Sequence, residues 1–340
     1  MRKTQALFGA AAAAAAIALL SACSGSGTQG TGATIPSTGA SQSHMRSDVS
    51  RMGISPKYYG LARIMQLRDA RPDKKKKVKA LYVDDFGYNA VEILNSKTWK
   101  NTGSISNGID GPDGNWVDTK GNLYVANYAG INITEYKPGG SSPSYTYSSG
   151  MSDPVAVSTD SKGNVYEGDY LGGYVGEYAQ GSNTQTAECS PGGYVEGVAV
   201  DKSGNVFVAY LSTTTDTGKI AEYKGGLKGC SATVLGVSLE YPGGMVMDKK
   251  GNLVVCDQDA EAVDVIAPPY SSVTGTLGSG YSDPFHVTVN KKNNQAYVAN
   301  YGGSDVFVLK YPSGSSIATL NSANGLSSPA AAVNSSNYVP

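Results

Sequence analysis

The chain has 340 residues, with 27 Lys and Arg against 28 Asp and Glu, and a net charge of −1. So balanced a charge gives no electrostatic support for nucleic-acid binding. Glycine (43) and tyrosine (23) are frequent and charged residues are sparse (16%), a mixture that favours many short strands joined by tight turns. No segment beyond the first 23 residues is apolar enough to cross a membrane.

Residues 1–22 have the organisation of a signal peptide. Arg2 and Lys3 supply a positive charge, and residues 7–20 form an apolar, alanine-rich stretch too short to span a bilayer as a mature helix. The peptide is therefore expected to direct the rest of the chain out of the cytoplasm.

The sequence Leu-Ser-Ala-Cys, ending at Cys23, resembles the lipobox of bacterial lipoproteins. The resemblance implies that Cys23 becomes the mature N-terminus and carries acyl chains, palmitate among them, which anchor the protein to a membrane. By the sorting pattern of enterobacterial lipoproteins, Ser24 implies the outer membrane where the organism has two membranes. The alternative is an ordinary signal peptide with a cysteine nearby.

Two segments separate this anchor from the folded part. Residues 23–55 are rich in Ser, Gly and Thr and predict a flexible tether, because such a chain cannot bury enough apolar surface to fold. Residues 56–78 predict an N-terminal extension with a short helix that stops at Pro72. The basic run from Lys74 to Lys77 is read first as a solvated loop and second as a contact for lipid headgroups.

From residue 79 onward an internal repeat of about 43 residues dominates the sequence. Five stretches share a short apolar strand, an Asx turn and a second strand, and a sixth is cut short. The leading Asp or Asn residues are 42, 41, 47, 42 and 44 residues apart; they are Asp118, Asp160, Asp201, Asp248, Asn290 and Asn334. Asp or Asn starts such turns by accepting backbone N–H groups, and Gly or Asn near the end tolerates positive φ.

A second marker follows each turn by about nine residues; these anchors are Asn127, Asp169, Tyr210, Asp257 and Asn300, with an extra copy at Asp85. The chain thus begins with the second half of a repeat and ends with the first half of one. Joining residues 329–340 to residues 79–94 completes a sixth blade and leaves no exposed sheet edge. The sequence therefore predicts an all-β, six-bladed β-propeller over residues 79–340, closed by strands from both ends of the domain.

The repeat resembles those of the NHL and YVTN-type propellers, and more distantly the gluconolactonase and streptogramin lyase families. The likeness rests on residues 197–201 (Gly-Val-Ala-Val-Asp), 204–209 (Gly-Asn-Val-Phe-Val-Ala) and 297–300 (Tyr-Val-Ala-Asn). It implies the fold, whereas propellers carry many unrelated activities.

Counting five residues back from each turn Asp or Asn predicts the residues that rim one mouth of the ring: Asp113, Val155, Glu196, Gly243, Phe285 and Pro329. In gluconolactonase-like propellers, acidic and Asn residues in such positions bind a divalent cation. The resemblance implies that Asp113 and Glu196, with His286 beside them, could hold Ca²⁺ or Mg²⁺. Four of the six blades offer no ligand there, so solvated rim residues are the favoured interpretation.

The six anchors form a second ring, in which Asp85, Asp169 and Asp257 alternate with non-acidic residues. Three carboxylates in pseudo-threefold positions could chelate Ca²⁺ or shift each other's pKa. The favoured interpretation is structural, with Asx side chains capping the turn into the third strand.

No catalytic set emerges from the remaining residues. His286 is the only histidine after the tether, and no Gly-x-Ser-x-Gly elbow, phosphate-binding loop or Cys-x-x-Cys motif is present. Outside the cytoplasm a disulfide is expected, and Cys189 and Cys230, in outer strands of consecutive repeats, are the best pair. Cys256 is expected to be a buried free thiol.

Together these features favour a non-catalytic cell-envelope module, anchored to the membrane, that binds a protein, glycan or small molecule or serves as a scaffold. The alternative is a metal-dependent lactonase or lyase that uses Asp113, Glu196 and His286. Neither interpretation identifies a ligand.

Overall fold

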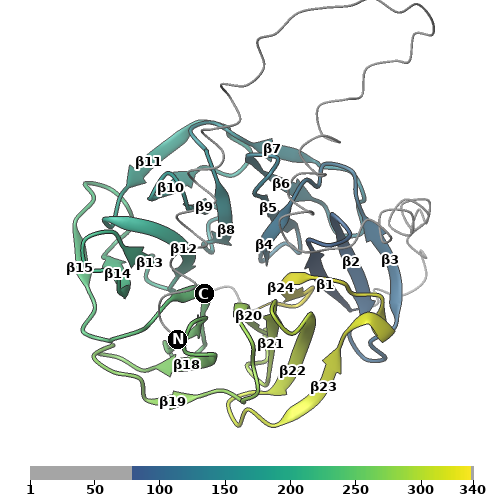
Figure 1. Cartoon of the computed structure of the whole chain (residues 1–340). Coiled ribbons are helices and arrows are strands. Elements are labelled where there is room, and N and C mark those ends of the chain that lie inside the picture. Colours follow the sequence, from purple (N-terminus) through teal and green to yellow (C-terminus); the bar gives the residue numbers. More distant parts are fainter. Residues whose placement is uncertain (1–78, 338–340) are drawn as a thin grey trace, which may run out of the picture. The chain divides into compact units, whose positions relative to one another are not determined.

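The structure, a computed structural model, describes residues 79–337 as six four-stranded antiparallel sheets arranged around an axis (Figure 1). The expected signal peptide, Cys23, the tether and the helical extension lie outside the described residues. Among the described residues, no helix is long and apolar enough to cross a bilayer. The predicted all-β, six-bladed propeller is confirmed.

Each sheet is one blade, numbered here in chain order. Blade 1 consists of β24 (Pro329–Asn334), β1 (Ala80–Asp85), β2 (Ala90–Asn95) and β3 (Asn101–Ile105). Blade 2 consists of β4 (Pro112–Val117), β5 (Leu123–Asn127), β6 (Asn132–Tyr136) and β7 (Tyr145–Tyr147). Blade 3 consists of β8 (Pro154–Thr159), β9 (Val165–Asp169), β10 (Tyr174–Tyr178) and β11 (Gln185–Cys189).

The other three blades repeat this order from the axis outward. Blade 4 consists of β12 (Gly193–Val200), β13 (Val206–Ser212), β14 (Gly218–Tyr223) and β15 (Ala232–Val234). Blade 5 consists of β16 (Pro242–Met247), β17 (Leu253–Asp257), β18 (Ala262–Ile266) and β19 (Gly275–Thr276). Blade 6 consists of β20 (Pro284–Val289), β21 (Gln295–Asn300), β22 (Asp305–Lys310) and β23 (Ser316–Leu320), followed by a 3-10 turn, Ser322–Asn324.

Strands from both ends of the domain close the ring. β24 is the innermost strand of blade 1 and pairs antiparallel with β1, with Leu81 opposite Asn334 and Val83 opposite Ala332 (Figure 1, where yellow β24 lies beside β1). The predicted closure is confirmed. Each inner strand is the end strand of its own sheet and lies between the inner strands of the two adjoining blades, so its open edge is short and faces the axis of the ring.

The turn between the first two strands of a blade forms as its sequence predicts. In blade 2 the Asp118 carboxylate accepts the backbone N–H groups of Lys120 and Asn122, both at 2.8 Å, and Gly121 has a φ of +86°. The turns that begin at Asp160, Asp201 and Asp248 repeat these bonds. We call the face of the propeller that carries these turns the turn face.

The core lies between neighbouring blades, where the alternating apolar side chains of the strands are buried. The inner strands approach one another so closely that a Cβ at Gly114 would overlap the carbonyl oxygen of Val155 in the next blade, and a Cβ at Gly197 would overlap that of Gly243. Glycine is therefore required at these two positions. Equivalent residues of consecutive inner strands lie together, so the strands run in the same direction around the axis.

Candidate functional site

The six anchors stand where the second strand of each blade ends, at the face opposite the turn face. Five of them pair with the proline that begins an inner strand: Asp85 with Pro329, Asn127 with Pro112, Asp169 with Pro154, Asp257 with Pro242 and Asn300 with Pro284. Their side chains accept backbone N–H groups from the loop that leads into that proline. The carboxylate of Asp257, for example, accepts from Glu240 at 2.8 Å and from Tyr241 at 2.7 Å.

Asp169 makes the fullest set of these bonds. Its carboxylate accepts the N–H groups of Ser152, Asp153 and Gly172 and the hydroxyl groups of Ser152 and Tyr174. Although burial acts to raise the pKa of Asp169, these donors lower it. Asp85 and Asp169 thus cap both the turn that follows them and the loop before the inner strand. The other three cap that loop, which the sequence did not predict; they are Asn127, Asp257 and Asn300.

Tyr210 is the exception, since a phenol cannot accept the paired N–H groups that a carboxylate accepts. In its blade β12 and β13 pair beyond this position, through Tyr194 with Leu211 and Gly193 with Ser212. A longer hairpin takes the place of the side-chain cap. In the other five blades the anchor side chains accept N–H groups from the loop before the inner strand.

Directly after each proline-anchor pair the inner strand contains a β-bulge. The extra residue is Asp113 in β4, Val155 in β8, Glu196 in β12 and Phe285 in β20, and the bulge of β16 falls at Gly243 and Gly244. In β24 the register places it at Ala330, one residue after the predicted Pro329. Bulges redirect side chains and are frequent beside sites. We call this side of the propeller the bulge face and its innermost residues the rim.

Asp113 is half-buried at the rim and carries a strongly perturbed carboxyl group. Burial raises the pKa of Asp113 well above its usual range, and the carboxylates of Glu196, Asp153 and Asp84 raise it further. Asp84 is fully buried beneath the rim and accepts a hydrogen bond from the side chain of Asn115 at 2.7 Å. Acidic side chains from blades 1 to 4 therefore act on one another at this face.

Glu196 is the second acidic rim residue. Burial raises its pKa to about 8, while the hydroxyl of Tyr241, which donates to its Oε1 at 2.6 Å, works in the opposite direction. Asp153 and Asp283 add repulsion. Burial together with Asp169 likewise raises the pKa of Asp153 to about 7. At neutral pH the rim therefore holds a mixture of protonated and ionised carboxyl groups.

Aromatic side chains surround these acids. The residue after each anchor is aromatic in four blades, and in five blades its N–H donates to the carbonyl of the residue before the proline, as Tyr170 donates to Asp153 at 2.9 Å. The aromatic residues at the bulge face are Phe86, Tyr128, Tyr170, Tyr194, Tyr241, Phe285 and Tyr301. Tyr170 stacks on Tyr194 with ring centroids 5.0 Å apart, and Phe285 lies 5.3 Å from Tyr301.

The third proposed ligand, His286, does not join Asp113 and Glu196. It lies on β20 one residue beyond the bulge, is 7% exposed, and packs against Gly244 of the neighbouring blade. Burial lowers its pKa to about 4, and its Nδ1 has no hydrogen-bond partner. Within residues 79–337 no three His, Cys, Asp or Glu side chains are grouped so that they could hold a metal ion.

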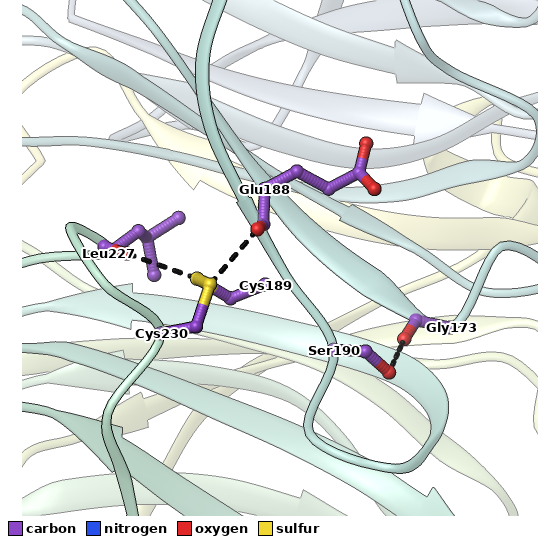
Figure 2. Close-up of a disulfide and its surroundings, with 6 residues drawn as sticks. All are labelled: Gly173, Glu188, Cys189, Ser190, Leu227 and Cys230. Carbon is purple, nitrogen blue, oxygen red and sulfur yellow. Dashed lines mark hydrogen bonds between the residues drawn. A yellow bond between two sulfur atoms is a disulfide. The ribbon is translucent and has the colours of Figure 1, made fainter.

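Cys189 and Cys230, the pair that the sequence singles out, form a disulfide between blades 3 and 4 (Figure 2). Their Cα atoms are 5.3 Å apart, and the bond ties the end of β11 to the loop between β14 and β15. The two sulfur atoms contact the carbonyl oxygens of Leu227 and Glu188 at 3.0 and 3.1 Å. Cys256 is free and fully buried in β17, and burial raises the pKa of its thiol.

Sequence reasoning found Asp113 and Glu196 but missed most of their surroundings. Asp153, Tyr241 and Asp283 each precede the proline of an inner strand. Four of the aromatic residues follow an anchor: Phe86, Tyr128, Tyr170 and Tyr301. Both offsets repeat in the sequence and could have been read there. Whether these offsets bring side chains to the rim depends on the bulge register and on the hydrogen bonds between loop and anchor, and the sequence pattern specifies neither.

Solved structures share this fold at low sequence identity. A chain from the crystal structure of a nidogen/laminin complex matches with a TM-score of 0.63 at 14% identity, over 76% of this chain and 98% of that one. A protein of unknown function from Bacteroides caccae matches with a TM-score of 0.60 at 13% identity, over 76% of this chain and 99% of that one.

These matches show the fold alone. No protein-family model and no curated protein matches the sequence. The resemblance to the NHL and YVTN-type repeats therefore stays a prediction about the kind of repeat. The six four-stranded sheets and the structural matches together identify residues 79–337 as a six-bladed β-propeller.

Proposed function

We propose that this protein is a non-catalytic, lipid-anchored binding module outside the cytoplasm, and that its bulge face binds a ligand bearing amines, either a small polyamine or lysine-rich protein segments. Acyl chains on Cys23 hold it to the membrane. The observation that carries the proposal is the joint presence, on one rim, of acidic and aromatic side chains from several blades. Carboxylates and aromatic faces are the groups that bind ammonium ions.

The distribution of charge supports a cationic ligand. Residues 79–337 contain 25 Asp and Glu, 15 Lys and no Arg. At the bulge face lie Asp113, Asp153, Glu196 and Asp283, whereas Lys219, at the start of β14, is the single lysine on that side among the described residues. An excess of one sign of charge around a rim attracts ligands of the other sign.

The raised pKa values of the rim acids give binding a distinct proton linkage. With the site empty, burial and mutual repulsion keep part of these carboxyl groups protonated at neutral pH. A bound ammonium group favours the ionised form, so binding releases protons and strengthens as the pH rises through 7 to 8. A neutral ligand that only stacks on the aromatic rings would show no such dependence.

Titration with spermidine tests the proposed site. The chain should bind spermidine more tightly at pH 8.5 than at pH 6, and should not bind triethylene glycol, a neutral molecule of similar length. Glu196→Gln removes one charge of a charge-assisted contact and should weaken binding about tenfold. Glu188→Gln, an exposed position on the outermost strand β11, is the matched control. Equal affinities for both variants and the parent protein would contradict the proposed site.

The lipid anchor requires its own test, in bacterial cells that acylate lipoproteins. The protein should incorporate labelled palmitate and fractionate with membranes, and Cys23→Ala should abolish both. Label retained by the Cys23→Ala variant would show that the attachment lies elsewhere. An unlabelled wild-type protein in the soluble fraction would show that there is no anchor.

The metal-dependent lactonase or lyase receives support from Asp113 and Glu196 alone, which share a rim. Among the described residues, no third His, Cys, Asp or Glu is grouped with these two so that the three could hold a metal ion, and His286 faces the next blade. We therefore do not propose a catalytic role.

A further inference from the structure

The lysines of the propeller lie almost entirely on the turn face. Inner strands and third strands both end at this face, and second strands begin there. Of the 15 lysines in residues 79–337, all except Lys219 lie in the Asx turns, at the ends of third strands, in the loops that follow third strands, or at the start of β1 and β3. The lysines are thus polarised toward the turn face, which also carries the turn carboxylates of Asp118, Asp160, Asp201 and Asp248.

Four of these lysines form what we call the lysine patch, on the adjoining blades 5, 6 and 1: Lys79, Lys250, Lys291 and Lys292. All four side chains are exposed. Hydrogen bonds join the segments that carry them, since the N–H of Lys249 donates to the side-chain Oδ1 of Asn293 in the next turn and the N–H of Lys291 donates to the carbonyl of Ser336. The patch is therefore continuous across three blades.

Within residues 79–337, few acidic side chains stand beside these lysines. The turn of blade 6 begins with Asn290 instead of Asp, and no acidic residue stands in the final turn of the chain, which begins at Asn334. Asp248 of blade 5 is 2% exposed and accepts the N–H groups of its own turn and the hydroxyl of Tyr311. The outward-facing charge of the patch is positive.

The polypeptide enters the propeller at the edge of this patch. The carbonyl of Ala80 accepts the N–H of Ser335, which places the start of β1 beside the turn that Lys291 contacts. In the sequence, Lys74 to Lys77 come directly before this point, and Lys77 precedes Lys79 by two residues. In the sequence, the basic run therefore adds four lysines directly before the patch residue Lys79.

We propose that the lysine patch docks the propeller on a membrane surface that contains anionic lipid headgroups, with the bulge face turned away from the membrane. This inference rests on the lipid anchor of the proposed function, because the described part of the chain begins at Lys79, within the lysine patch. Clustered lysines bind anionic bilayers through headgroup phosphates and carboxylates, and their contributions add. Docking would present the amine-binding rim to partners in the surrounding space.

Vesicle binding tests the docking without the anchor. All six sheets and the closure lie within residues 80–334, so a chain that begins at residue 24 retains every strand described here. This unacylated chain should bind vesicles of phosphatidylcholine with 30% phosphatidylglycerol, bind pure phosphatidylcholine far more weakly, and dissociate in high salt. Lys250→Gln with Lys292→Gln should weaken binding to the anionic vesicles by roughly tenfold or more.

The matched control is Lys120→Gln with Lys162→Gln. These two lysines occupy the same position in the turns of blades 2 and 3, are exposed, and lie outside the patch. Their loss should weaken binding less than threefold, and both double variants should keep the parent's urea midpoint. Equal losses for the two pairs, equal binding to neutral vesicles, or tighter binding to double-stranded DNA than to anionic vesicles would overturn the proposal. Because this chain lacks Cys23, the outcome does not depend on acylation. Because the assay measures binding to vesicles, the outcome does not depend on spermidine binding either.

Discussion

Asp169 shows at the scale of one residue how a repeated side chain fixes the path of the backbone. Its carboxylate accepts three backbone N–H groups, from Ser152, Asp153 and Gly172, and two hydroxyl groups. These bonds hold the loop before β8 against the end of β9, and they bring Asp153 and Tyr170 to the bulge face. The anchor therefore positions the candidate site without facing a ligand itself.

Replacing Asp169 with alanine should lower the free energy of unfolding by about 3 kcal/mol, because several partly buried N–H groups lose their acceptor. Urea denaturation measures the change. Asp259→Ala, at an exposed acidic residue after β17, should stay within about 0.5 kcal/mol of the parent. A loss at Asp169 no larger than that at Asp259 would show that the anchor bonds contribute little.

The buried acids make stability fall as the pH rises. The pKa values of Glu92 and Asp153 are about 7 and that of Glu196 is about 8, against about 4 in the unfolded chain. Between these values the native state binds more protons than the unfolded state, so the free energy of unfolding decreases from about pH 4 to about pH 8 and then levels off. Asp169, with its lowered pKa, acts in the opposite direction only at lower pH.

Thermal unfolding at pH 5, 7 and 8.5 should therefore show a melting temperature that declines across this series. Asp153→Asn with Glu196→Gln, which mimics the protonated forms, should reduce the decline. A melting temperature that rises from pH 5 to pH 8.5, or a double variant with the parent's slope, would contradict the assignment of raised pKa values to these groups.

At the scale of the element, the outer strands are the most exposed part of each blade, and the disulfide reinforces one of them. Cys189 ends β11 of blade 3, and Cys230 lies in the loop before β15, where blade 4 has a three-residue outer strand. The bond closes a segment of 41 residues that contains most of blade 4. It should stabilise mainly by restricting the unfolded chain.

The variant Cys189→Ala with Cys230→Ala should unfold with a free energy about 3–4 kcal/mol lower than that of the oxidised parent. Urea denaturation of both proteins, with and without reductant, measures this difference. Reductant should destabilise the parent and leave the variant unchanged. A parent insensitive to reductant, with a thiol count of three after denaturation of the chain lacking Cys23, would show that the bond does not form.

The elements also show what the sequence can and cannot specify. Asp118 and Asn122 identify a turn by their own chemistry, since their side chains bond the turn's backbone. The bulges have no such local signature, because they arise from the pairing of an inner strand with an anchor some fifteen residues further on. Counting back from the turn therefore gave the bulge residue of β4, Asp113, but in β24 it gave Pro329 instead of the bulge residue Ala330. His286 was placed on the rim by sequence distance, whereas the bulge before it turns its ring toward blade 5.

At the scale of the whole molecule, the half-repeats at the two ends of the domain made the closure predictable. Five complete turns and one partial turn determine the number of blades. β24, at the end of the domain, pairs with β1, at its beginning. The polarity of the lysines toward the turn face was not predicted, because it depends on which ends of the strands lie together. The combination of acidic and aromatic side chains at the rim was likewise not predicted, because its residues come from segments that are far apart in the sequence.

A chain that ends at Ser328 lacks β24 and should not form the closed ring. Blade 1 would lose its inner strand, and β1 and β20 would lose their neighbour on that side. We expect loss of a cooperative urea transition and association of the exposed strands. A chain that ends at Asn337 keeps all six sheets and is the control. A truncated protein that unfolds cooperatively at the control's midpoint would contradict closure by β24.

The central claim, that the acidic and aromatic rim binds amines, is tested most directly by calorimetric titration with spermidine at pH 7.5 in two buffers of different ionisation enthalpy. The difference in heat between the buffers gives the number of protons exchanged on binding. The rim carboxyl groups, with their raised pKa values, predict net release of protons, and Glu196→Gln should reduce it. No binding, or binding without proton release in the parent protein, would contradict the account.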